Sequence, residues 1–339
     1  MKIVFRVDAS KELGIGHLMR CLALSEELVR KGNVCFFLSK IDNDELKNRI
    51  KKFDVNYQQI KNNANIQEDL KFLINFSKIN DIDWIITDHY GIDSQYIREI
   101  KQNKFNVLSV DDTAQIHYYS DIVLNQNVGT ERLKFSSEKY TKFLLGIKYA
   151  ILRDELLKRE GKIENNEVKK ILLTFGGSET DNFILKILRV LEPINENVEF
   201  LVVVGPFSQS YNNIKEHAKE TSLEVKLIKS PENMAEVYLE SDIAVSAGGS
   251  SCYELAYFGI PNLIITIADN QVNIAHELDK QKVSIYLGRK DEIKADQLKN
   301  SLKDLIASHS LRKIMRQNGR KLVDGKGKER IVDFMRRFN

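Results

Sequence analysis

The sequence has few cysteines, no long apolar run and no dense block of basic residues. Its three cysteines, Cys21, Cys35 and Cys252, are odd in number, widely spaced and set among apolar residues. We therefore expect buried, reduced thiols in a cytoplasmic protein. No stretch reaches the roughly 18 apolar residues that a membrane-spanning helix needs. Asp8 interrupts the apolar amino terminus too early for a signal peptide.

The net charge of the chain gives little indication of a polyanionic partner. A formal net charge of +3 is spread over 339 residues, so we expect neither nucleic-acid binding nor binding to a membrane surface. This length, with 42% hydrophobic residues, is enough for two domains, each with its own core.

Short β-branched and aromatic runs alternate with longer amphipathic stretches along the whole chain. This alternation is typical of βα units around a parallel sheet, and it predicts an α/β fold. The expected strands lie near Lys2–Val7, Asn33–Leu38, Trp84–Thr87, Val107–Val110, Ile122–Leu124, Ile171–Phe175, Phe200–Val204, Val225–Ile228, Ile243–Ser246 and Leu263–Ile267.

The alternation pauses near Tyr149–Glu155, and a polar run follows before the strong strand that begins at Ile171. We therefore predict a first domain over residues 1–154 and a second over residues 155–339. Each domain should be doubly wound. The last thirty residues or so are helical in pattern and basic, with a break expected at Gly325–Gly327.

Ligands of open parallel sheets bind beyond the carboxyl ends of the strands, so the loops there carry the candidate sites. The first loop runs from Asp8 through Gly14 and Gly16 to His17 at a helix start. Met19 stands where the dinucleotide fingerprint needs a third glycine, so we expect no nicotinamide or flavin cofactor. His17 could take a proton from water, or it could only cap the helix.

The next strand ends provide further polar residues. Asp88, His89 and Tyr90 follow Trp84–Thr87; Tyr90 could orient a sugar, whereas Asp88 and His89 serve equally well as hydrogen-bond anchors. Asp111 and Asp112 close the following strand, and we interpret them as caps, not as metal ligands. No metal is expected.

Two glycine-rich loops in the second half could bring backbone N–H groups to a phosphate. One contains Gly176 and Gly177, and the other contains Gly248, Gly249, Ser250 and Ser251. Glu254, one turn into the next helix, could accept hydrogen bonds from a ribose or could act as a cap. Asn270, Gln271 and Asn273 offer the donors and acceptors that sugar hydroxyls and N-acetyl groups need, or they form only a helix cap.

Together these motifs resemble two known families. The segment Val225–Leu278, with Ser246–Glu254 and Asp269–Asn273, resembles the nucleotide-sugar half of the GT-B glycosyltransferase that makes lipid II. The amino-terminal motifs Phe5–Asp8, Gly14–His17, Asp88–Gly91 and Leu108–Asp112 resemble UDP-2,4-diacetamido-2,4,6-trideoxy-β-L-altropyranose hydrolases of pseudaminic acid biosynthesis. The resemblance covers nearly the whole chain and implies a GT-B type fold, with two Rossmann-like doubly wound parallel-sheet domains facing a cleft.

The resemblance also implies an activity: metal-independent hydrolysis of a UDP-sugar with inversion at the anomeric carbon. His17 would be the general base, and Tyr90 would position sugar or water. The diphosphate, the ribose and the sugar would be bound by Asp8, Gly14, Gly16, Arg20, Gly176, Gly177, Met234, Gly248, Gly249, Ser250, Ser251, Glu254, Asn270, Gln271 and Asn273. We expect a monomer without a cofactor, with UDP-sugar as its ligand.

Three other functions remain open: a GT-B glycosyltransferase, a hydrolysing 2-epimerase, and a non-catalytic UDP-sugar-binding protein. The chain runs somewhat longer than the plain hydrolase pattern because of its basic helical tail. We expect this tail to pack back across the cleft toward the first domain.

Overall fold

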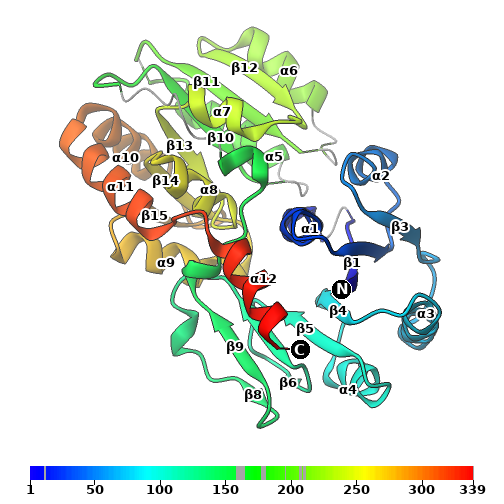
Figure 1. Ribbon diagram of the computed structural model, residues 1–339. Helices are drawn as coiled ribbons and strands as arrows, with labels where there is room; N and C mark the ends of the chain where they lie inside the picture. Colours follow the sequence, from blue (N-terminus) through cyan, green and yellow to red (C-terminus); the bar gives the residue numbers. More distant parts are fainter. Residues whose placement is uncertain are drawn as a thin grey trace. The chain divides into compact units, whose positions relative to one another are not determined.

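The computed structural model describes residues 1–10, 13–157, 165–176, 181–194, 196–205, 208 and 211–338. The chain divides into two compact units, one of Met1–Arg153 with Lys326–Asn339 and one of Asp154–Gly325 (Figure 1). Among the described residues, no helix is both long enough and apolar enough to cross a membrane.

The first unit is built on a parallel sheet with the strand order β3-β2-β1-β4-β5-β7-β9. Its strands are β1 Lys2–Val7, β2 Val34–Ser39, β3 Asn56–Gln59, β4 Trp84–Asp88, β5 Asn106–Val110, β7 Ile122–Asn125 and β9 Lys142–Leu145, beside a small pair, β6 His117–Tyr118 and β8 Ser136–Ser137. Its helices are α1 Gly16–Arg30, α2 Asp44–Ile50, α3 Ile66–Ile79, α4 Ser94–Gln102 and α12 Gly327–Arg337. The central strands are buried except at the first residues of β1 and β5, as expected for a parallel sheet covered on both faces.

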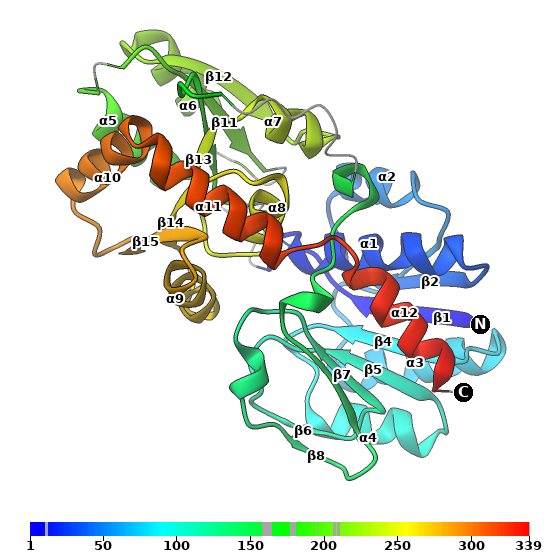
Figure 2. The same ribbon diagram turned by 60° about the vertical axis from the view of Figure 1, so that its left-hand side comes forward.

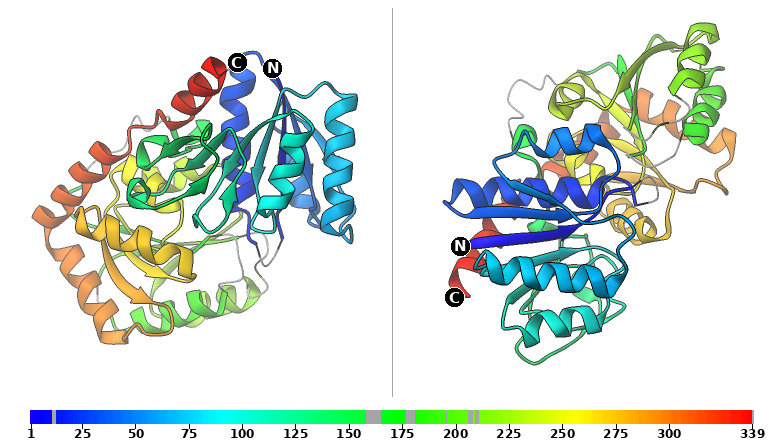
Figure 3. Two further views of the ribbon diagram at one scale, coloured as in Figure 1. Left: turned by 90° about the horizontal axis from the view of Figure 1, so that it is seen from below. Right: turned by 90° about the vertical axis from the view of Figure 1, so that its right-hand side faces the viewer.

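Successive side chains of each strand point to opposite faces of the sheet, so each face has its own apolar core. Val4, Ile85 and Val107 belong to one cluster with Leu70 and Leu73 of α3 and with Ile97 and Ile100 of α4. Helix α1 lies on the opposite face from α3 and α4 (Figure 3). The strand order places the carboxyl ends of β1 and β4 side by side, and this pairing positions the candidate site described below.

A buried cation lies beside that position. Arg6 of β1 is only 2% exposed. Its guanidinium donates to Asp8 (2.8 Å from Nη2 to Oδ2) and to Asp69 of α3 (2.8 Å from Nε to Oδ1). Lys40 and Tyr96 also contact Asp69, at 3.0 and 2.7 Å. These bonds tie the end of β1 to α3 and α4.

The second unit repeats the scheme with the strand order β12-β11-β10-β13-β14-β15. Its strands are β10 Lys170–Thr174, β11 Glu199–Val204, β12 Glu224–Lys229, β13 Ile243–Ser246, β14 Asn262–Thr266 and β15 Ser284–Arg289. Its helices are α5 Asp181–Leu191, α6 Tyr211–Glu220, α7 Met234–Glu240, α8 Ser251–Phe258, α9 Val272–Lys280, α10 Ala295–Ala307 and α11 His309–Leu322. The carboxyl ends of β10 and β13 are neighbours here, as those of β1 and β4 are in the first unit.

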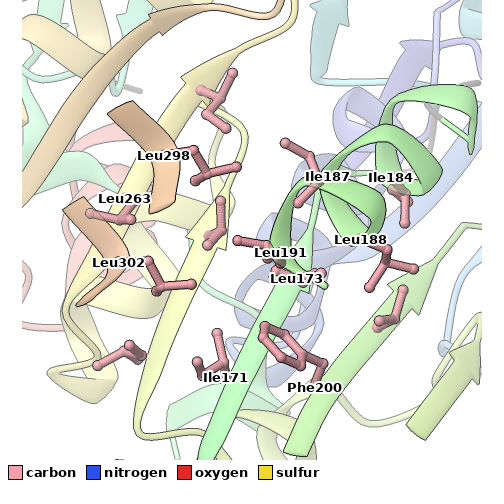
Figure 4. Close-up of a cluster of buried hydrophobic side chains, with 14 of the residues drawn as sticks. Ile171, Leu173, Ile184, Ile187, Leu188, Leu191, Phe200, Leu263, Leu298 and Leu302 are labelled. Atoms are coloured by element: carbon pink, nitrogen blue, oxygen red, sulfur yellow. The ribbon is translucent and has the colours of Figure 1, made fainter. Parts of the chain in front are cut away.

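The core of the second unit joins α5 and α10 to the sheet. Figure 4 shows Ile184, Ile187 and Leu188 of α5 near Leu173 and Phe200 of the strands, and all five belong to one buried cluster. The same cluster contains Leu298 and Leu302 of α10 and Leu263 of β14. The sheet is therefore held by helices whose apolar residues recur every three or four positions.

The basic tail has a structural explanation in its arginines. Arg312 of α11 is buried and donates to the carbonyls of Leu305 and Ile306 at the end of α10. Arg316 and Arg320 donate to the carbonyls of Gly259 and Phe258 at the end of α8, beside which α11 runs (Figure 2). Cations at these ends satisfy terminal carbonyls and oppose the negative end of each helix dipole.

The predicted break near Gly325–Gly327 is present, since α11 ends at Leu322 and α12 begins at Gly327. Helix α12 lies in the first unit and packs on α1. Lys328 of α12 is buried and reaches Glu26 of α1 at 3.3 Å. The amino terminus and the end of α12 consequently lie close together.

Gly327→Ala should weaken the docking of α12. A Cβ at Gly327 would lie 2.1 Å from the backbone oxygen of Ala150 and 2.6 Å from the carbonyl carbon of Tyr149, and neither is the end of a flexible side chain. We expect the free energy of unfolding to fall by about 1–3 kcal/mol in urea titration. Glu329→Ala, at an exposed position of the same helix, should change it by less than about 0.5 kcal/mol. Equal stability of the two variants would contradict this packing.

The Arg6 network should make the first unit sensitive to acid. Burial raises the pKa values of Asp8 and Asp69, but their hydrogen bonds to His89, Arg6 and Tyr96 lower them more, so both lie below the ordinary 3.8. A lowered folded-state pKa contributes stability above the unfolded-state pKa, and this stability is lost as the pH falls through the folded-state value. The free energy of unfolding should therefore decrease below about pH 4.

Asp69→Asn tests this dependence. The variant should be about 3–5 kcal/mol less stable at pH 7, because Arg6 loses a buried partner, and its stability should fall less steeply on acidification. The control is Asp54→Asn, at an exposed position of the same unit. Parallel pH profiles for parent and Asp69→Asn would show that this carboxylate is not responsible.

Candidate active site

The loops after β1, β4 and β5 bring the sequence-predicted residues of the first unit together. His17, Asp88 and Tyr90 line one cavity of about 340 Å³ with Arg20 and Asp112. Strands β2 and β3 lie on one side of β1, and β4 and β5 lie on the other. The cavity lies at this change of direction, which is the usual ligand position in doubly wound sheets.

His17 is oriented by Asp88. Its Nδ1 lies 2.6 Å from Asp88 Oδ1 and 3.0 Å from Arg20 Nη2. Arginine can only donate a hydrogen bond. If Nδ1 carries a proton, Nδ1 can therefore bond to Asp88 but not to Arg20. Because an ionised carboxylate only accepts, the Asp88 contact requires a proton on Nδ1. This tautomer leaves the lone pair on Nε2, which has no hydrogen-bond partner within the described part of the chain.

Asp88 is kept ionised by its surroundings. Burial raises the pKa of this carboxyl, but the charge of Arg20 and the hydrogen bonds from Arg20 and His17 lower it more, so that the pKa lies well below its usual range. Arg20 donates to both Asp88 oxygens at 2.6 Å. Cys21 is a buried thiol whose pKa is raised by burial and by Asp88, so it stays protonated and can donate to Oδ2 across 3.4 Å.

Arg20 continues the network to the next strand end. It donates to both oxygens of Asp112, at 3.0 and 2.8 Å, and thus bridges Asp88 and Asp112. Asn127 donates to Asp112 Oδ1 at 3.0 Å. Predicted here as a substrate-binding residue, Arg20 is turned toward two carboxylates, an arrangement suited to holding loops in place.

Tyr90 stands at the edge of this cluster. Its ring meets that of His17 edge to face, with centroids 4.7 Å apart, and its hydroxyl donates to Asp112 Oδ2 at 3.3 Å. About half of the residue is exposed. Tyr90 can therefore contact a ligand while it restricts the His17 ring.

His89 has a different role from His17. The backbone N–H of Gly91 donates to His89 Nδ1 at 2.8 Å, so the proton of the neutral ring is on Nε2, which lies 3.1 Å from Asp8 Oδ2. Both ring nitrogens are therefore engaged. Asp8, predicted as a substrate-binding residue, accepts hydrogen bonds from Arg6, from His89 and from the backbone N–H of Lys40. It is only 5% exposed.

Two glycines shape the first loop. Gly14 has a φ of +73°, and its N–H donates to the carbonyl of Ser10 at 2.8 Å, so it makes a turn that a residue with a Cβ rarely adopts. Gly16 begins α1, and a Cβ there would meet nothing within 4 Å. The turn delivers His17 to the first position after the helix start.

In the second unit, the glycine-rich loop after β13 packs against the turn after β14. A Cβ at Gly248 would lie 3.0 Å from the Cβ and backbone oxygen of Gln271. The Gln271 side-chain oxygen accepts from the N–H groups of Gly248 and Ile267, at 3.2 and 3.0 Å. At Gly249 a Cβ would meet nothing within 4 Å, so this side of the loop is open.

The remaining predicted residues of the second unit occupy several positions. Ser250 and Ser251 stand at the start of α8, without a side-chain cap from Ser250. Glu254 accepts a 2.6 Å hydrogen bond from Tyr238, and the buried Met234 starts α7 with its N–H directed at Glu155. Asn270 and Asn273 are exposed in the turn Asp269–Gln271 and in the first turn of α9. Gly176, with a φ of +87°, follows β10, and Gly177 lies outside the described residues.

Asp88 and Asp112 were the residues that pattern alone did not assign to the site. The sequence pattern fits Asp88 equally well as a hydrogen-bond anchor at a strand end, and it fits Asp112 as a cap. The missing signal is strand order: once β1, β4 and β5 are known to be neighbours in that order, the residues after them must converge.

Comparison with known proteins points to nucleotide-sugar enzymes. Uncharacterized protein MJ1062 of Methanocaldococcus jannaschii is 32% identical over 78% of this chain, which spans only 55% of that protein. Spore coat polysaccharide biosynthesis protein SpsG of Bacillus subtilis is 24% identical over 98% of this chain and 97% of its own length. The UDP-2,4-diacetamido-2,4,6-trideoxy-beta-L-altropyranose hydrolase of Campylobacter jejuni is 27% identical over 83% of this chain and 97% of its own.

The fold is shared with solved glycosyltransferase structures. Acinetobacter baumannii MurG superposes with a TM-score of 0.70 over 99% of this chain and 100% of its own, at 14% identity. Residues 171–331 match the model of the glycosyltransferase family 28 C-terminal domain. The chain therefore has the predicted GT-B fold of two Rossmann-like, doubly wound domains, the second of which is similar to the C-terminal domain of glycosyltransferase family 28.

Proposed function

We propose that the chain hydrolyses a UDP-linked 2,4-diacetamido-2,4,6-trideoxy sugar to the free sugar and UDP, in the biosynthesis of a nonulosonic acid such as pseudaminic acid. The observation that carries the proposal is the His17–Asp88 pair, which leaves Nε2 of His17 as a base in a cavity. The Campylobacter relative, whose name states this reaction, supports the choice of substrate.

The chemistry needs one base and one stabilised leaving group. A water oxygen attacks the anomeric carbon while His17 Nε2 takes a proton from that water, and the bond from this carbon to the diphosphate oxygen breaks. The electron pair leaves with UDP, and attack opposite to it inverts the anomeric centre. Asp88 fixes the tautomer of the neutral His17 ring and stabilises the imidazolium that forms when the ring takes the proton.

The second unit would serve the nucleotide. Its loop Gly248–Ser251 at the start of α8 offers backbone N–H groups and hydroxyls to a diphosphate, whose negative charge grows as the bond breaks. Glu254 would hold the ribose. The Arg316 and Arg320 contacts at the other end of α8 keep this helix in place.

A glycosyltransferase is the second candidate, favoured by the match to family 28 and by the likeness to MurG. In this case His17 would deprotonate an acceptor hydroxyl instead of water. The two candidates share the base and the UDP leaving group, and they differ only in the nucleophile.

Incubation with the UDP-linked diacetamido-trideoxy sugar should release UDP and a free sugar of inverted configuration without any acceptor. Proton NMR follows both products, with EDTA present to remove free metal ions and with UDP-N-acetylglucosamine as a comparison substrate. Stable substrate would remove the hydrolase assignment. Turnover that starts only when a sugar or lipid acceptor is added would identify a transferase.

His17→Asn should lower kcat by about 10²–10⁴-fold, because it removes the base, and should leave UDP affinity nearly unchanged. His117→Gln is the matched control, since His117 lies away from this cluster and contacts Ser136 and Glu138. A His17→Asn enzyme with a near-parental kcat would exclude His17 as the base.

Asp88→Asn should lower kcat by at least about tenfold and redistribute the His17 tautomers. Long-range ¹H–¹⁵N spectra of the histidine rings report the tautomer directly, which separates positioning from a loss of stability. In the parent, His17 should carry its proton on Nδ1 and His89 on Nε2. An unchanged His17 tautomer in Asp88→Asn would contradict the positioning role.

A further inference from the structure

A row of three polar side chains crosses neighbouring strands of the second unit, next to the glycine-rich loop Gly248–Ser251. Ser246 ends β13, Asn262 begins β14, and Ser284 begins β15 directly opposite Asn262. All three are at most 2% exposed. Burial of polar groups is unfavourable unless they bond to one another, so a polar row inside a sheet calls for a reason.

The hydrogen bonds of this polar row run in one direction, toward the loop. Ser284 Oγ donates to Asn262 Oδ1 at 2.5 Å, and Asn262 Nδ2 donates to Ser246 Oγ at 2.9 Å. The Ser246 hydroxyl in turn donates to the carbonyl of Ala247 at 3.1 Å. Each group thus orients the next one, and the row ends on the last backbone carbonyl before Gly248.

The peptide group between Ala247 and Gly248 is held at both ends. Its carbonyl also accepts from Cys252 Sγ at 3.1 Å. Burial raises the pKa of this thiol to about 12, so the thiol keeps its proton and can donate it. The N–H of the same peptide donates to the Gln271 side chain at 3.2 Å. Because a peptide group is planar, these contacts determine the direction in which the chain enters the loop.

The loop beyond that peptide offers the backbone groups that a diphosphate would use. The N–H groups of Gly249, Ser250 and Ser251 donate to no other group in the described part of the chain. They can serve one anion together only if the loop keeps its shape, because each N–H must point at the same ligand.

We propose that Asn262 is a positioning residue for nucleotide binding: through Ser246 it fixes the Ala247–Gly248 peptide and so forms the loop before a ligand arrives. Asn262 is 1% exposed and lies at the amino end of β14, whereas ligands bind at the carboxyl ends of the strands. It therefore acts on the loop and does not touch the ligand. This inference rests on the proposed function for the presence of a nucleotide at this loop.

An apolar replacement of the whole polar row separates positioning from stability. Asn262→Leu alone should lower the midpoint of thermal unfolding, because it leaves the buried Ser246 and Ser284 hydroxyls without their partner. A triple variant with Asn262→Leu, Ser246→Ala and Ser284→Ala has no such hydroxyls, so its midpoint should return toward that of the parent. UDP affinity, measured by calorimetry, should nevertheless be about three- to tenfold weaker in both variants, because nothing holds the Ser246 donor on the Ala247 carbonyl. Parental UDP affinity in the triple variant would overturn the inference.

Leu298→Ala is the matched control. Leu298 packs in one cluster with Leu263, whose side chain points to the opposite face of the sheet from that of its neighbour Asn262 (Figure 4). This variant should lower the midpoint of unfolding and leave UDP affinity unchanged.

Uridine is the second control, because it lacks the diphosphate. Its affinity, measured by NMR titration, should be the same for the parent and for the triple variant. Equal losses of affinity for UDP and for uridine would indicate a general distortion of the nucleotide site and would overturn the positioning role.

The outcomes separate this inference from the proposed function. Hydrolysis of the diacetamido sugar by the parent, with UDP affinity unchanged in the triple variant, would overturn only the positioning role. UDP binding that depends on the polar row, without hydrolysis, would overturn only the hydrolase assignment. Failure of the parent to bind UDP would overturn both.

Discussion

The first unit depends on two arginines, the buried Arg6 and the largely buried Arg20, each held between two aspartates at the carboxyl end of the sheet. Arg6 lies between Asp8 and Asp69, and Arg20 lies between Asp88 and Asp112. A guanidinium removed from water is costly unless carboxylates surround it, so neither arginine can shift without breaking several charge-assisted bonds. Because the aspartates come from the loop after β1, from β4, from α3 and from the loop after β5, the two pairs of bonds fix the loops around the cavity.

These two networks give two neighbouring histidines opposite tautomers. The Arg20 network keeps Asp88 ionised, and Asp88 then requires the proton of His17 on Nδ1. The Arg6 network holds Asp8 against His89 Nε2, while Gly91 occupies its Nδ1. A histidine with both nitrogens occupied serves the fold, whereas one with a single oriented nitrogen can exchange a proton. The difference between the two residues thus comes from their partners.

The sequence predicts best the strands whose side chains are buried on both faces of the sheet. Strands β1, β4, β10 and β13 are mostly apolar and almost wholly buried, and the sequence predicts each of them to within one residue. Strands β3 and β15 escaped prediction because both are sheet edges, where polar residues such as those of Asn56–Gln59 remain in contact with water. The His17–Asp88 pair, 71 residues apart, depends on strand order, which local patterning does not contain.

The two units differ in the charge of the groups that their strand-end loops offer. The cavity of the first unit has three carboxylates for one arginine, an environment for a neutral group. The second unit has a glycine-rich loop at the start of α8, where N–H groups favour an anion, and its tail arginines are bonded to helix carbonyls. The proposed hydrolysis would use this contrast, because carboxylates near His17 stabilise the imidazolium that forms as the water loses its proton, while N–H groups stabilise the negative charge that grows on the diphosphate. A cationic first unit would stabilise an anion there but would make His17 harder to protonate as the water loses its proton.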